Sequence, residues 1–116
     1  MCIRDRFLAG DAAHIVPATG AKGMNLALAD VKVLAEAFSA WFRSKSRHLL
    51  DQYSDRCLRR VWRAEHFSAW MTALLHRDPT GDPLDHKLRL SYLRYIVRSE
   101  AAATTLAENY VGFENA

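Results

Sequence analysis

The sequence predicts a mainly α-helical fold in which one short N-terminal strand precedes three to four helices. The apolar stretch Phe7-Leu-Ala ends at the polar pair Gly10-Asp11, which is typical of a strand that runs into a loop. Apolar residues then recur at three- and four-residue steps along most of the chain. The segment 78–83, with two prolines and a glycine, predicts one sharp turn between helices.

Composition places the chain among ordinary globular domains. It has 116 residues, of which 50% are hydrophobic and 25% charged, so one core of its own is expected. No apolar run approaches the ~20 residues of a membrane span, and no membrane association is expected. Cys2 and Cys57 form neither a disulfide framework nor a metal pair, which favours a reducing, cytoplasmic location.

The first helix is expected from about Ala21 to Phe42, before the polar break at 43–47. We expect one apolar stripe along it to face the core. The stripe consists of Met24, Leu28, Val31, Ala35 and Phe38.

A second, unusually long helix is expected from His48 to His76. Its apolar positions are Leu50, Tyr53, Cys57, Val61, Ala64, Met71 and Leu75. After the turn, Asp82-Pro83 can cap and start a third helix that reaches about Arg98. Ser99 can cap a short fourth helix that ends before Asn109.

The segment from Phe7 to Ala27 carries the most chemistry. The expected strand ends in a loop that carries the carboxylate of Asp11, and a helix begins a few residues later. A carboxylate accepts hydrogen bonds from hydroxyl groups, and the free N–H groups of a first helical turn attract negative charge. This arrangement suits a polyhydroxylated, partly anionic ligand. On chemistry alone, the alternative is that Asp11 only caps a turn.

Residues 7–27 closely resemble the second flavin-binding motif of the class A flavoprotein aromatic hydroxylases, whose GD pair holds the ribityl chain of FAD. Three later blocks, 53–72, 75–77 and 107–112, resemble the 4-hydroxybenzoate 3-monooxygenases within that family. The resemblance covers 7–116. It implies that the chain is a mainly helical fragment of an α/β FAD-binding aromatic hydroxylase fold.

The domain organisation follows from the same resemblance. Residues 1–6 do not resemble the family, and we interpret them as a spurious leader. Residues 7–42 would form the strand, the GD motif and the flavin-facing helix, and residues 43–116 a helical region with a subunit interface and a substrate-side loop. The G-x-G-x-x-G turn of such enzymes does not occur in this sequence, so we expect a C-terminal piece that is inactive alone.

The resemblance also implies residue roles. Asp11 would bind the ribityl hydroxyls, and the helix start would contact the flavin through Gly20, Lys22, Gly23, Met24 and Asn25. The substrate would meet Ala18, Thr19 and Tyr110, and Tyr110 would belong to a relay that removes the phenolic proton. Ala18 departs from the family, which has a proline there, so the identity of the substrate is less certain than flavin binding.

Each role has a simpler alternative in ordinary structure. Gly20 and Gly23 could be turn and helix-start glycines, and Met24 could pack in the core. Lys22 could be a solvated surface lysine, and Tyr110 could be a packing residue in a C-terminal loop.

The implied parent activity is the insertion of one oxygen atom of O₂ ortho to the hydroxyl of 4-hydroxybenzoate, with FAD as cofactor, NADPH as reductant and a homodimer as the assembly. A related hydroxylase with another phenolic substrate is the alternative within enzymes. Outside enzymes, the net charge of +3 and a basic stripe suggest a helical nucleic-acid-binding module, although a solvated or subunit-facing surface is favoured. The stripe is Arg56, Arg59, Arg60 and Arg63. The five histidines lack metal-ligand spacing, so no metal is expected.

Overall fold

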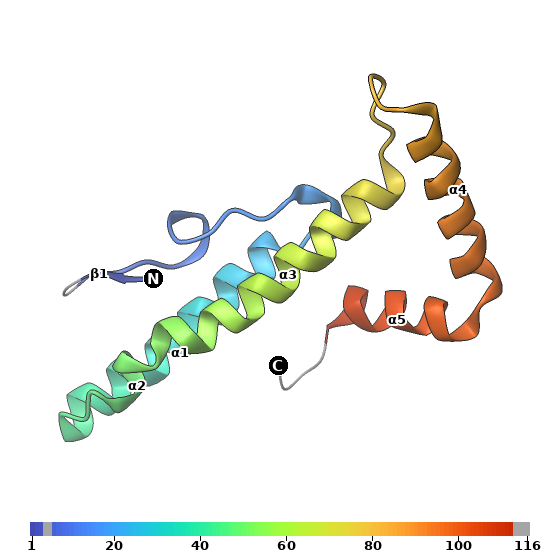
Figure 1. Cartoon of the computed structure of the whole chain (residues 1–116). Helices are drawn as coiled ribbons and strands as arrows, with labels where there is room; N and C mark the ends of the chain where they lie inside the picture. The colour runs from blue at the N-terminus through green and yellow to red at the C-terminus, as the bar shows by residue number, and fades with distance from the viewer. Residues whose placement is uncertain (4–5, 113–116) are drawn as a thin grey trace.

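A computed structural model describes residues 1–3 and 6–112, and these residues form an elongated, mainly helical molecule of 58 × 32 × 17 Å. Two long helices, α1 (Gly23–Ser44) and α3 (Tyr53–Leu75), lie side by side, joined by the short α2 (His48–Asp51) (Figure 1). The N-terminal segment runs along this pair. Helices α4 (Pro83–Arg98) and α5 (Glu100–Val111) form an arm at the far end of α3, and α5 turns back toward α3 (Figure 1). The predicted mainly helical fold is confirmed.

The N-terminal strand is shorter than expected. Strand β1 (Cys2–Ile3) pairs antiparallel with β2 (Arg6–Phe7), and the chain leaves strand geometry after Phe7. Two 3-10 turns follow, η1 (Gly10–Ala12) and η2 (Ala18–Gly20). The hypothesis that residues 1–6 are a foreign leader stays a prediction, and its residues 4–5 lie outside the described part of the chain.

The helix ends that carry local signals match the prediction. The side chain of Asp82 accepts a hydrogen bond of 2.7 Å from the N–H of Leu84, and α4 starts at Pro83. Ser99 Oγ accepts from the N–H of Ala102 at 3.3 Å, so Ser99 caps α5. The predicted second helix, in contrast, is interrupted at Gln52, a residue that carries no helix-breaking signal.

The end of α5 corrects one expectation. The fourth helix runs to Val111 and not only to the residue before Asn109. Tyr110 therefore lies in the last helical turn, so its expected place in a C-terminal loop is wrong, whereas its substrate-side role stays a prediction. Gly112 ends the helix with φ of +86°, a conformation that glycine adopts without strain.

The face that α1 buries is also not the predicted one. The buried residues are Leu26, Asp30, Val33 and Ala37. On the predicted stripe, Met24 is 74% exposed and Leu28 62% exposed. Helix α1 carries apolar residues on two faces. Because the charged Asp30 interrupts the face that packs in the core, the periodicity of apolar residues favoured the other face.

The core lies between α1 and α3. One cluster contains Leu26, Val61 and Ala64 with Val16 packed against it. The other contains Val33, Tyr53 and Cys57 with Met1, Phe7 and Leu34. The predicted face of the second helix is confirmed as far as Ala64, after which Phe67, Ser68 and Leu74 are buried while Leu75 is exposed.

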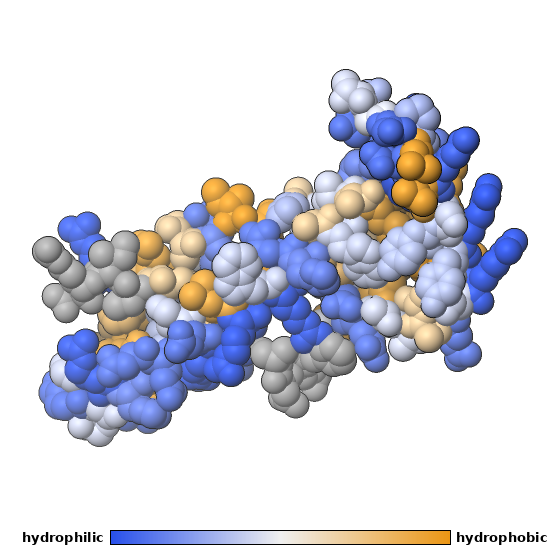
Figure 2. Space-filling view, in the orientation of Figure 1, coloured by the Kyte–Doolittle hydropathy of each residue, from blue (hydrophilic) through white to orange (hydrophobic). Residues whose placement is uncertain are grey.

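The α4–α5 arm (residues 83–111) buries little. Ile96 is its one buried residue, and its two helices pack mainly on each other. Figure 2 shows apolar groups at the surface over the long helices and along the arm. Among the described residues, no helix combines the length and the apolar character that crossing a membrane requires.

The buried thiol of Cys57 predicts a pH effect. Burial, and then a hydrogen bond to Asp30 and the charge of Asp30, raise its pKa to about 12 from 9.0. The unfolded chain loses this proton first, so the thiol lowers the free energy of unfolding as pH rises from 9 toward 12, and has no such effect below 9. At about pH 8 its thiolate fraction should be roughly a thousandfold below that of an unshifted thiol.

We therefore expect iodoacetamide to label Cys57 very slowly in a folded Cys2→Ser variant, and rapidly in guanidinium chloride. Mass spectrometry follows the labelling and circular dichroism follows the fold. Labelling of the folded chain at the rate of a free thiol would contradict the burial of Cys57.

Candidate functional site

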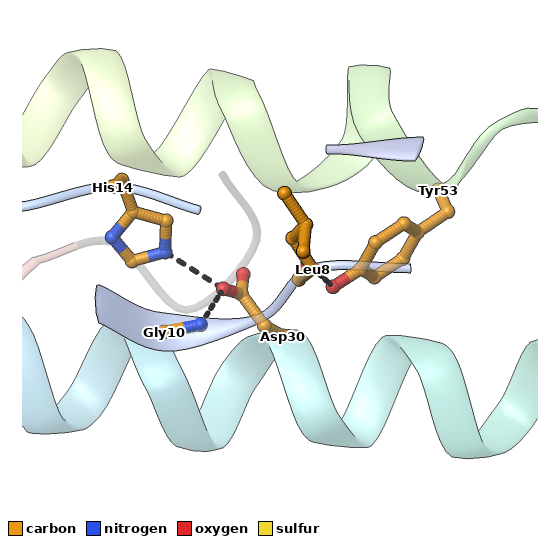
Figure 3. A network of polar contacts seen from close by, with 5 residues as sticks. All are labelled: Leu8, Gly10, His14, Asp30 and Tyr53. Carbon is orange, nitrogen blue, oxygen red and sulfur yellow. Dashed lines mark hydrogen bonds and ion pairs between the residues drawn. The ribbon is translucent and has the colours of Figure 1, made fainter. Parts of the chain in front are cut away.

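A buried carboxylate joins the N-terminal loop to the helix pair. Asp30, on the packed face of α1, is 2% exposed. Its Oδ2 accepts hydrogen bonds from the backbone N–H of Gly10 at 3.0 Å and from Nε2 of His14 at 2.7 Å (Figure 3). Asp30 also lies near the thiol of Cys57 on α3, whose pKa it raises. One carboxylate on α1 thus binds two donors of the loop and lies beside α3.

Gly10 is required where the chain leaves the strand. Its φ of +59° disfavours any other L-residue, and a Cβ here would lie 3.0 Å from the Cβ of Ala27. The backbone therefore presses directly onto α1. The next residue, Asp11, is exposed, so the turn presents its carboxylate at the surface.

Tyr53 holds the residue that precedes this turn. Its hydroxyl donates to the carbonyl of Leu8 at 2.8 Å (Figure 3). Its ring packs edge-on against Phe7. Burial is the main cause that raises the pKa of Tyr53 above its ordinary value, and the neighbouring Cys57 and Asp30 add to it. The phenol therefore keeps the proton that it donates to Leu8.

The loop and the amino end of α1 enclose an open cleft of about 600 Å³. Its lining consists of Asp11, residues 15–18, residues 21–24 and Ala27. Within the described residues, no side chain caps α1, so the free N–H groups of its first turn lie at the cleft. The cleft thus has the carboxylate of Asp11 on one side and the positive, amino-terminal end of α1 on the other. This pairing can bind hydroxyl groups at one side and negative charge at the other.

The structure brings five of the predicted site residues to this cleft, namely Asp11, Ala18, Lys22, Gly23 and Met24. Gly23 stands out among them. The nearest atom to a Cβ at Gly23 would be Val16 Cγ2 at 4.0 Å, so the space in front of this backbone is open.

Gly20 and Thr19 face α3 instead. A Cβ at Gly20 would lie 2.5 Å from Ser68 Oγ, so a larger residue there would force the Ser68 side chain or η2 to move. Thr19 Oγ1 is 2.7 Å from Oγ1 of Thr72. Because Thr72 donates its proton to the carbonyl of Ser68, Thr19 is the donor in this pair. Both residues fix the loop on α3, and their predicted roles toward ligands stay predictions.

Lys22 links the cleft to the end of α5. Its Nζ donates to the backbone carbonyl of Tyr110 and lies 5.2 Å from the centroid of the Tyr110 ring. The Tyr110 ring packs edge-on against Phe67, and 56% of the residue is exposed. Lys22 and Asn25 also line a smaller cavity of about 170 Å³. Tyr110 itself lines neither cavity.

The sequence interpretation missed Asp30 and the binding role of His14. A signal was present, because Asp30 stands in helical register with Leu26 and Val33. A charged residue on an apolar face predicts a buried, partnered carboxylate. The described residues contain no cluster of ligating side chains that could hold a metal ion.

Comparison with known proteins matches residues 4–68 to the FAD binding domain family. The p-hydroxybenzoate hydroxylase of Acinetobacter baylyi is 58% identical over 106 residues, which are 91% of this chain. The chain spans about a quarter (26%) of the length of that relative.

The contact between Gly20 and Ser68 predicts a suppressor. Gly20→Ala should lower the free energy of unfolding by ~1–3 kcal/mol, because the added methyl group displaces the Ser68 hydroxyl. Ser68 Oγ is buried without a hydrogen-bond partner in the described structure, so Ser68→Ala alone should be neutral or slightly stabilising. Added to Gly20→Ala, it should recover much of the loss.

Denaturant unfolding of the four chains measures these differences. Additive effects, with no recovery in the double variant, would show that η2 does not pack on Ser68 in this way.

Proposed function

We propose, from the premise that this chain belongs to the FAD binding domain family, that the cleft at the amino end of α1 is its FAD site. The observation that carries the proposal is the pairing of the exposed Asp11 carboxylate with the free N–H groups of α1 across one cleft. FAD offers the matching chemistry, with ribityl hydroxyls and a ring that becomes negative on reduction.

The residues present fit this cofactor. Asp11 would accept hydrogen bonds from the ribityl hydroxyls. Gly23 has no close neighbour that explains its missing side chain, and a glycine early in a helix costs up to ~1 kcal/mol relative to alanine. Close approach of the flavin to the backbone of Gly23, Met24 and Asn25 supplies the reason. Lys22 would add a positive charge beside the ring.

For the whole protein we propose FAD-dependent 3-hydroxylation of 4-hydroxybenzoate, with O₂ as co-substrate and NADPH as reductant. The support is the 58% identity to a relative named p-hydroxybenzoate hydroxylase. When bound, FAD supplies the oxygen activation that places one oxygen atom ortho to the phenol hydroxyl. A role in aromatic catabolism in the cytoplasm would accompany this activity.

This chain's own residues would hold the phenol and move its proton. The carbonyl of Ala18, at the cleft, would face the phenol hydroxyl, and Thr19 would be its neighbour on the substrate side. Tyr110 would pass the phenolic proton onward, since a phenolate ring is the better nucleophile. Lys22 supports this role by tying the carbonyl of Tyr110 to the start of α1.

Two alternatives have less support. A hydroxylase for another phenolic acid is compatible with Ala18, where the family has proline. A nucleic-acid-binding module would need a continuous basic face, and the arginine stripe does not form one. Arg56 Nη2 is 3.6 Å from Glu36 Oε2, and Arg59 donates to the Asp55 carbonyl of its own helix. Arg60 and Arg63 line the small cavity beside Lys22.

The two site assignments can be separated in a chimera in which this chain replaces the matching quarter of the Acinetobacter baylyi relative. Asp11→Ala should weaken FAD binding ~10- to 100-fold, because flavin hydroxyls lose their acceptor. Tyr110→Phe should leave FAD binding nearly unchanged and lower the yield of product per NADPH consumed. Equilibrium FAD titration and product analysis measure the two effects.

Gly23→Ala is the matched test of the open cleft. It should keep or raise the thermal stability of the apoprotein, as alanine favours a helix, yet weaken FAD binding. Normal FAD affinity in Asp11→Ala, or full coupling in Tyr110→Phe, would contradict the corresponding role.

We further propose a homodimer in which the α4–α5 arm takes part. Large apolar side chains on its surface support this, among them Leu88 at 58% and Val97 at 84% exposure. In sedimentation velocity the 116-residue chain should associate between about 1 and 100 µM. Leu88→Ser should weaken this association, whereas Lys87→Ser, on the adjacent exposed position, should not. A monomer across that range would contradict the proposal.

A further inference from the structure

The carboxylate of Asp30 ties the Asp11 loop to α1 by hydrogen bonds. Two of its donors, Gly10 N–H at 3.0 Å and His14 Nε2 at 2.7 Å, flank Asp11 in the sequence. The side chains of Asp30 and His14 are only 3% and 5% exposed, so neither can exchange its partner for water.

Asp11 has no comparable support of its own. It is exposed, and among the described residues none hydrogen-bonds its carboxylate. Nδ1 of His14 is buried and lacks a partner in the described structure, so the bond to Asp30 alone orients the imidazole. The position of Asp11 therefore depends on Gly10, directly before it, and on His14, three residues after it, which are both bound to Asp30.

We propose that Asp30 is a positioning residue of the cofactor site, which holds Gly10 and His14 on α1 and thereby fixes where Asp11 meets the ligand. This inference rests on the proposed FAD site. Asp30 lies in the core and does not touch the cleft. Its effect on FAD must pass through Asp11, whereas a purely structural role would weaken binding whether or not Asp11 is present.

A double-mutant cycle in the chimera distinguishes these two roles. Asp30→Asn keeps the shape of the side chain but removes its charge and one acceptor oxygen. In the presence of Asp11 it should raise the Kd for FAD on the order of tenfold. In an Asp11→Ala background the same change should alter the Kd less than about twofold, because the contact that Asp30 positions is already gone.

Equal loss in both backgrounds, or no loss in the first, would overturn the positioning role while leaving the FAD site intact. A normal Kd in Asp11→Ala alone would instead overturn the proposed cofactor contact, and the inference would fail with it. The two failures are therefore distinguishable.

A matched pair of variants covers the case in which Asp30→Asn does not fold. His14→Ala and Cys57→Ala each remove a buried side chain beside Asp30, but only His14 belongs to the Asp11 loop. Both should lower the thermal midpoint of the apoprotein. Only His14→Ala should weaken FAD binding, and His14→Gln, which restores an N–H donor, should recover most of it. FAD affinity that follows stability in both variants would overturn the inference.

Discussion

A carboxylate that is closed off from water constrains the rest of this structure. Transfer of an ionised group into a protein interior is highly unfavourable unless donors surround it. Asp30 receives those donors from the loop, at Gly10 and His14, and Tyr53 on α3 donates to the same loop at Leu8. The strand exit, α1 and α3 must therefore assemble together, because any one of them missing leaves buried polar groups without partners. The apolar clusters on either side of Asp30 extend this assembly along the helices.

Between its two anchoring glycines, the loop owes its shape to close backbone contact. Gly10 touches α1 at Ala27, and Gly20 touches α3 at Ser68. Steric fit explains both glycines without a ligand. Gly23 differs, because the nearest described neighbour of its missing Cβ, Val16 Cγ2, is 4.0 Å away, and its helix would be more stable with alanine. Of the three glycines in this motif, Gly10 and Gly20 thus allow the close packing that shapes the loop, whereas Gly23 leaves the cleft open.

Local signals in the sequence predicted local structure well. The caps at Asp82 and Ser99 and the proline-rich turn depend on neighbouring residues, so they could be identified without tertiary contacts. The packed face of α1 could not, because Met24 and Leu28 are as apolar as the residues that are buried. The packed face of α1 is set by the partners of Asp30, His14 and Gly10, which lie 16 and 20 positions earlier in the chain. The cleft residues were predicted from the family resemblance. Which of them are buried, and which residues they contact, could be learned only from the structure.

The contact between Lys22 and Tyr110 joins residues 88 positions apart in the chain. Closing so long a loop costs more conformational entropy than closing the short connection between α1 and α3. The arm that carries Tyr110 buries a single side chain, so little apolar burial compensates for that entropy. The Tyr110 end is therefore expected to open locally at a lower free-energy cost than the Asp11 end, which the helix pair fixes. The two ends of the proposed site would then differ in how long each stays formed in the folded chain.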